Sequence, residues 1–142
     1  MGSNIVFSAN NREEVIILPV VPEIELGNPQ ENERFKTINN GTMNLIGDEG
    51  LRTFSITSIF PSKEYPWLKP GSVAEPFRYV EFFEKWRARK VPLRIVASRP
   101  DGREWFNMPV LIDNFNYRVR RNGDIAYTLE CSEYRFVQEG VN

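Results

Sequence analysis

The sequence contains no histidine and a single cysteine, Cys131, among its 142 residues. Without histidine, neither a Ser-His-Asp triad nor a Cys-His pair can form, and the commonest metal ligand is missing as well. One cysteine excludes an internal disulfide and any cysteine-rich metal site, which fits a protein made in a reducing cytoplasm. We therefore predict a protein that is not an enzyme and has no catalytic, cofactor-binding or metal-binding residues.

The sequence also lacks a charge bias and a long apolar run. Eighteen basic residues stand against nineteen acidic residues, which gives a net charge of −1. Such a chain has no global positive field to hold nucleic acid or an anionic membrane surface. No apolar run approaches the roughly 20 residues that span a bilayer, and the first residues lack the features of a signal peptide. We expect no membrane partner and a protein that is made in the cytoplasm.

Motifs that bind phosphate or calcium are missing too. The sequence has no glycine-rich phosphate-binding loop. Its turn carboxylates, Asp48, Glu49, Asp113 and Asp124, have spacings that match no calcium-binding loop. We interpret these four residues as solvated turn residues.

Extended segments dominate what is present. Alternating or β-branched patterns predict strands over residues 4–8, 14–21, 23–26, 34–38, 42–46, 52–60, 93–97, 105–119 and 125–132. Turn-forming residues at 39–41 and 121–124 predict two hairpins, and Pro19 and Pro22 restrict the second strand to an edge. Cys131 alternates onto the same face as Tyr127 and Leu129, so it is predicted to be a small core residue.

One helix is predicted, over about residues 76–90. Pro76 suits the first helical position, and Tyr79, Phe83 and Trp86 recur at helical spacing. Pro92 stops the helix. The predicted fold is mainly β, an antiparallel sandwich or barrel with one packed helix, in a single domain over residues 1–137 that is followed by a tail over 138–142.

Two basic clusters allow more than one interpretation. Residues 87–90 contain three cations at the end of the predicted helix, where they complement the helix dipole. Residues 118–121 contain Arg118, Arg120 and Arg121, which can protect a strand edge or, with Tyr117 nearby, contact a single-stranded nucleic acid. The net charge of −1 makes nucleic acid the less favoured partner.

Seven stretches carry a resemblance to a known family: residues 44–47, 53–62, 76–86, 91–96, 112–117, 123–129 and 133–136. The last three, with the sequences IDNFNY, GDIAYTL and EYRF, are similar to the closing segment of that family. The chain resembles the N-terminal domain of the XkdP/YqbP-like tail baseplate proteins, known from the PBSX defective prophage, over about residues 14–137. Members of the family usually continue into a LysM module, which this chain does not reach, so it is either a truncated or a short member.

The resemblance implies a tail-tube-like fold and a structural role in a contractile tail, whether of a phage, an R-type bacteriocin or a prophage particle. It implies a baseplate or tube-initiator adaptor that is made in the bacterial cytoplasm and forms a ring of itself, a hexamer in related adaptors. The implied partners are the tail tube protein, the central hub or spike protein and the tape-measure protein. The alternatives are a peptidoglycan-binding accessory protein and, less favoured, a nucleic-acid-binding module.

Two segments are candidates for docking in such a ring. The proline-rich loop over residues 61–70 contains the apolar anchors Tyr65, Trp67 and Leu68. The hairpin over residues 118–124 contains Arg118, Arg120 and Arg121. Ordinary loop packing explains both segments equally well. Exposed strand edges that pair between neighbouring copies are a further expected contact.

Overall fold

Six strands form one antiparallel sheet in the computed structural model, which describes residues 3–37, 41–47 and 49–135. The order of the strands is β2-β1-β6-β7-β8-β5. Their bounds are β1 Ile5–Ala9, β2 Glu14–Ile17, β5 Thr53–Phe60, β6 Leu93–Ser98, β7 Glu104–Val119 and β8 Ile125–Glu133. Strands β2 and β5 are therefore the two edge strands of this sheet.

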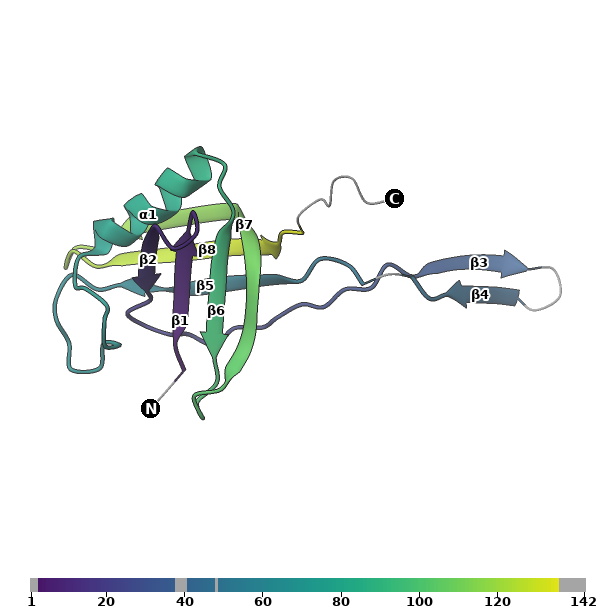
Figure 1. The fold of residues 1–142 in the computed structure, drawn as a ribbon, viewed down its shortest axis with the longest axis horizontal. Coiled ribbons are helices and arrows are strands. Elements are labelled where there is room, and N and C mark those ends of the chain that lie inside the picture. Colours follow the sequence, from purple (N-terminus) through teal and green to yellow (C-terminus); the bar gives the residue numbers. More distant parts are fainter. Residues whose placement is uncertain (1–2, 38–40, 48, 136–142) are drawn as a thin grey trace.

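Strand β7 belongs to both layers of the fold. Its first half pairs with β6 from Glu104 to Val110, and its second half pairs with β8 from Val110 to Val119. The register shifts between Ile112 and Asn114, which marks a β-bulge, and bulges bend and twist a strand. Figure 1 shows the sheet folded over along β7, so that β2, β1 and β6 face β8 and β5. The predicted β-sandwich with one helix is confirmed.

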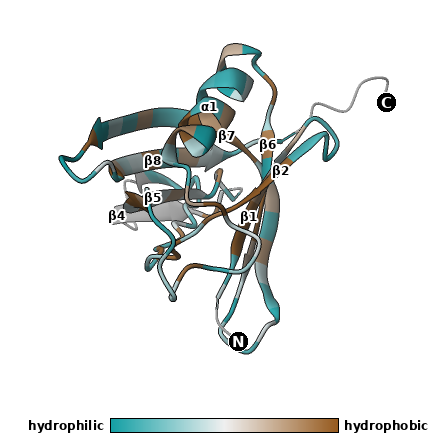
Figure 2. Cartoon of the chain, turned by 90° about the vertical axis from the view of Figure 1, so that its left-hand side faces the viewer, coloured by the Kyte–Doolittle hydropathy of each residue, from teal (hydrophilic) through white to brown (hydrophobic). Residues whose placement is uncertain are grey.

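The core lies between these layers and is rich in aromatic rings. Phe60 stacks on Tyr127 with ring centroids 3.9 Å apart and on Tyr79 at 4.9 Å. Phe7 meets Phe83 edge to face at 5.1 Å. Figure 2 shows that apolar residues, in brown, recur along the strands and along α1, and the buried ones form a single core cluster. Cys131 is buried here as predicted, and burial raises the pKa of its thiol, so the thiol stays protonated at neutral pH.

Helix α1 (Pro76–Ala88) covers the open side between the two layers, and it confirms the predicted helix. Its buried face consists of Tyr79, Val80, Phe82, Phe83 and Trp86. The Trp86 indole N–H donates to Glu14 Oε1 at 2.8 Å, which joins the helix to the edge strand β2. The helix ends at Ala88 because Lys90 takes a left-handed backbone with φ 58°, and the Val91 N–H then donates to the Trp86 carbonyl.

The predicted strand over residues 23–26 is wrong. These residues have no strand partner, and the first contact with the sheet is an isolated bridge between Gly27 and Thr53. Pro22 cannot donate to a ladder, and the chain leaves the sheet directly after Gly27. Ile24 and Leu26 still pack against the core, so the alternation correctly predicted which side chains face inward. The preceding predicted strand ends at Ile17, close before Pro19, and it is an edge strand as expected.

The hairpin predicted in the first third of the chain forms, but it does not join the sandwich. Strands β3 (Glu33–Thr37) and β4 (Gly41–Leu45) pair only with each other in the described structure. They form the far part of an arm, defined here as residues 28–50, that projects from the body (Figure 1). The predicted turn at 39–41 falls mainly on residues outside the described ones, as does the predicted tail over 138–142.

Candidate assembly surfaces

The two predicted docking segments lie at the same end of the molecule. Ser62, at the start of the proline-rich loop, donates its N–H to Asp124 Oδ1 at 2.7 Å and lies beside the turn between β7 and β8. The Ser62 hydroxyl is 2.8 Å from the same oxygen and 3.1 Å from the carbonyl oxygen of Asn122. We call this end, formed by residues 61–75 and 118–124, the docking end.

Asp124 joins the two segments of the docking end through its hydrogen bonds with Ser62. The prediction that Asp124 is a solvated turn residue is wrong. The residue is 3% exposed. Burial alone would raise its pKa, but the hydrogen bonds from Ser62 and from the Asn122 amide lower the pKa below its usual value. A charged carboxylate is stable here because N–H and O–H donors surround it.

The proline-rich loop is held in place by short-range contacts. Tyr65 and Trp67 stack with ring centroids 4.7 Å apart, and the Leu68 N–H donates to the Tyr65 carbonyl. The Tyr79 hydroxyl accepts from the Val73 N–H at 2.9 Å and lies 3.2 Å from the Val73 carbonyl oxygen. Trp67 nevertheless leaves 54% of its surface exposed, whereas Tyr65 and Leu68 are half-buried. The loop therefore presents one large aromatic side chain on a fixed backbone.

The three predicted arginines of the docking end are all exposed, but they do not form one cluster. Arg118 and Arg120 line a hollow of about 410 Å³ together with Thr57 and Tyr117, and Arg121 is not among its lining residues. The turn itself is closed by the Arg120 N–H, which donates to the Asp124 carbonyl at 2.8 Å. The hollow lies on the outer face of the layer formed by β5, β8 and the second half of β7.

Within the described residues, β2 and β5 are the edge strands of the sheet, and the second half of β7 pairs only with β8. No strand pairs with the outer edge of β2, and β5 has an outer partner only at Thr53. The sequence of β5, TFSITSIF, has no charged residue, proline or glycine. Strands of this kind pair readily with other chains when their edges are free.

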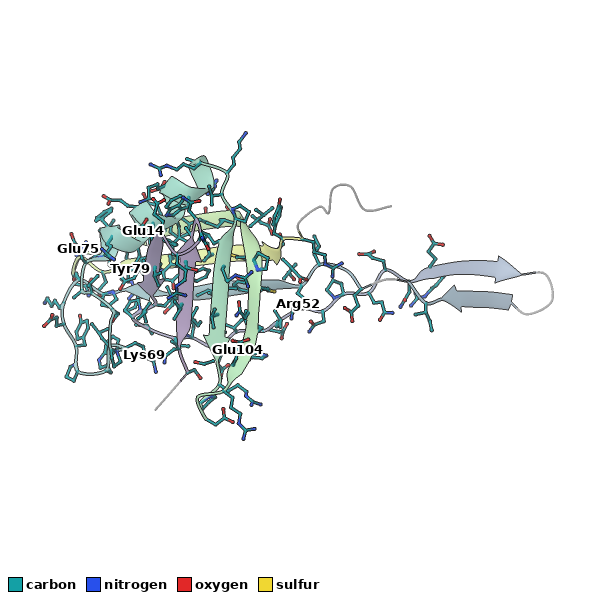
Figure 3. All side chains as sticks on the ribbon, in the orientation of Figure 1. Glu14, Arg52, Lys69, Glu75, Tyr79 and Glu104 are labelled. Carbon is teal, nitrogen blue, oxygen red and sulfur yellow. The ribbon has the colours of Figure 1, made fainter. Side chains whose placement is uncertain are left out.

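The arm is the feature that sequence reasoning missed. Its base is fixed by Arg135, whose guanidinium donates to the carbonyl oxygens of Glu49 at 3.3 Å and Gly50 at 3.2 Å. Arg52, which Figure 3 shows at the junction of arm and body, forms an ion pair with Glu133 at 3.4 Å. Burial would raise the pKa of Glu133, but hydrogen bonds from Arg52 and the charge of Arg135 lower it. A usable signal existed, because residues 27–36 contain Phe35 as their one apolar side chain other than proline and glycine.

Neither a metal cluster nor a spanning helix occurs in the described part of the chain. Among residues 3–37, 41–47 and 49–135, no group of three or more Cys, Asp and Glu residues is placed to hold a metal ion. The helices within the same ranges are too short or too polar to cross a membrane.

No known protein-family model matches this chain. Over 132 residues, 91% of its length, it is 26% identical to the uncharacterized protein YqbP of Bacillus subtilis (strain 168). The chain spans 58% of the length of that relative. The fold is shared with a chain from a structure described as the tail of an empty GTA particle, computed with helical refinement and C6 symmetry. The two chains superpose with a TM-score of 0.55 over 94% of this chain and 92% of the other, at 14% sequence identity.

Proposed function

We propose that this chain is a structural subunit of a phage-type contractile tail, and that it serves as a baseplate or tube-initiator adaptor between the tail tube and the central hub. The observation that carries the proposal is the shared fold over 94% of the chain with a subunit of a tail particle that has C6 symmetry. The similarity to YqbP, together with the resemblance to tail baseplate proteins, supports the narrower role.

The open edges of the sheet supply a means of forming a ring. In a head-to-tail ring, the edge of β5 in one copy lies beside the edge of β2 in the next copy, so that one contact repeats around the symmetry axis. Such pairing satisfies backbone N–H and C=O groups that are otherwise left to water. A closed ring therefore turns two edges that favour aggregation into a limited assembly.

The docking end is suited to a different partner from the neighbouring copy. Trp67 offers a large exposed apolar side chain on a loop that Ser62 joins to the hairpin between β7 and β8, and that hairpin exposes Arg118, Arg120 and Arg121. Aromatic and arginine side chains contribute most to many protein interfaces. We assign this end to contact with the tube, hub or tape-measure protein.

The test is to mix the purified chain with candidate tube and hub proteins from the same particle and to examine the mixture by negative-stain microscopy and co-purification. We expect rings that bind at the end of a tube or on a hub. Trp67→Ala should weaken the binding, and Leu111→Ala, which truncates an exposed apolar side chain of β7 outside the docking end, is the control. A chain that forms no ring and binds neither protein would contradict the proposal.

A second candidate is binding of a nucleic acid, because Arg118, Arg120 and Tyr117 line one hollow. This function predicts binding to single-stranded oligonucleotides that weakens steeply with salt and is lost when the arginines are replaced. Binding to peptidoglycan has no comparable feature in its favour. Retention of the chain on purified cell walls is the measurement that would support peptidoglycan binding.

A further inference from the structure

The C-terminal end of α1 carries a group of exposed cations that is separate from the docking end. Arg87, Arg89 and Lys90 lie at the end of the helix, and Arg12 lies in the turn between β1 and β2. Arg12 also lines a hollow of about 440 Å³ together with residues 91–94, which directly follow Lys90. We call Arg12, Arg87, Arg89 and Lys90 the basic end.

These four cations have no carboxylate partner within the described residues. The ion pair nearest to them joins Lys85 to Glu14, and Glu14 is already bonded to the Trp86 indole as well. Arg89 lies over the Trp86 ring at 5.1 Å, so its charge stays at the surface. Like charges gathered on one surface repel one another, and a partner with carboxylates would reduce the repulsion.

The arm has the complementary property. Residues 28–50 contain four acidic residues and two basic residues, namely Glu31, Glu33, Asp48 and Glu49 against Arg34 and Lys36. Glu31, Glu33 and Glu49 are exposed and form no ion pair with another described residue. A two-stranded hairpin is only marginally stable in water unless something packs against it. The arm is therefore an acidic element that gains stability from a basic surface.

We propose that the acidic arm of one copy docks against the basic end of a second copy. The two features do not meet within one molecule, because the arm projects sideways from the body while the basic end lies at the top of the body, where α1 ends (Figure 1). The contact is consequently head to tail, and a head-to-tail contact closes into a ring when its rotation allows. This inference rests on the proposed ring and names the surfaces that select the neighbouring copy.

The test uses two variants of the full chain with reversed charges. The first is Glu31→Lys with Glu33→Lys, which makes the arm basic, and the second is Arg87→Glu with Arg89→Glu, which makes the basic end acidic. We expect each variant alone to self-associate on the order of tenfold more weakly than the unchanged chain. An equal mixture of the two should associate again, because each arm then meets an end of opposite charge. Sedimentation velocity over a concentration series at low and high salt measures this.

The matched control is Arg99→Glu with Arg103→Glu, which changes two exposed cations at the turn between β6 and β7, outside the arm, the basic end and the docking end, by the same total charge. Equal weakening in this control would show a general charge effect and would overturn the inference. Urea unfolding of all variants verifies that they fold, and recovery in the mixture cannot come from a misfolded chain.

If rings form as before with either reversed variant, the inference is wrong while the proposed function stands. If the unchanged chain also stays monomeric with tube and hub proteins, both are wrong. A basic end that binds a DNA oligonucleotide without self-association would overturn it too.

Discussion

At the scale of single residues, two buried tyrosines differ in what their hydroxyl groups contact. Tyr79 exchanges two hydrogen bonds with the backbone of Val73, whereas the Tyr127 hydroxyl is buried with no hydrogen-bond partner among the described residues. Burial raises the pKa of both phenols, so both stay neutral. A buried hydroxyl without a partner loses its hydration and gains nothing in return.

We therefore predict opposite effects for the same chemical change at these two positions. Tyr79→Phe should lower the free energy of unfolding by about 1–2 kcal/mol, because two hydrogen bonds are lost. Tyr127→Phe should leave it unchanged or raise it by up to about 1 kcal/mol, because a desolvated hydroxyl is removed. Urea unfolding of the two variants measures the difference. A clear loss of stability in Tyr127→Phe would mean that its hydroxyl has a partner.

Asp124 makes the stability of the docking end depend on pH. Its pKa is lower in the folded chain than its usual value, so the carboxylate's contribution is complete above about pH 4 and is lost as the pH falls through the folded pKa. Asp124→Asn keeps the shape and removes the charge, and it should cost about 1–2 kcal/mol at pH 7. The difference in free energy of unfolding between this variant and the unchanged chain, measured by urea titration, should be smaller at pH 3 than at pH 7. A gap that is constant across pH would show that the charge has no role.

At the scale of elements, the sequence predicted the features whose causes are local. Helix α1 follows from the spacing of its aromatic residues and from Pro76, and β5 and β8 follow from the alternation of apolar and polar residues over most of their length. The end of α1 was less predictable, because Lys90 takes a left-handed backbone that glycine usually supplies. The alternation at residues 23–26 correctly predicted which side chains face the core, but it wrongly predicted that the segment pairs as a strand. Alternation indicates only which side of a segment faces the core.

The arm shows where local signals stop being informative. Its hairpin was predicted from the turn residues, yet nothing in that pattern says whether a hairpin joins the sheet or leaves it. The deciding facts are non-local, namely the bond from Arg135 to the Glu49 carbonyl and the bridge between Gly27 and Thr53. Only part of the docking end was predicted from the sequence. Its residues were named from the sequence, but the contact of Ser62 with Asp124 that brings the two segments together was not.

At the scale of the whole molecule, strand order decides which edges remain open for assembly. The order β2-β1-β6-β7-β8-β5 places β1 beside β6, with β2 at one edge and the uncharged β5 at the other edge. This order depends on pairings between distant segments, which no local pattern specifies. The proposal that strand edges pair between copies consequently became specific only with the fold, in which β2 and β5 are the edge strands.

A lysine at position 55 tests this assignment directly. Ser55 is exposed on β5 and lies opposite Glu130 of β8, so Ser55→Lys places its charge beside a carboxylate within the same molecule. The free energy of unfolding should therefore change by less than about 0.5 kcal/mol. A lysine on an edge strand opposes pairing with another strand, so rings should no longer form with tube or hub proteins. Ser132→Lys adds the same charge, beside Asp113, on strand β8, which pairs with β5 on one side and with β7 on the other, and should still form rings in the same negative-stain images. Rings that persist in Ser55→Lys would exclude the edge of β5 as the contact between copies.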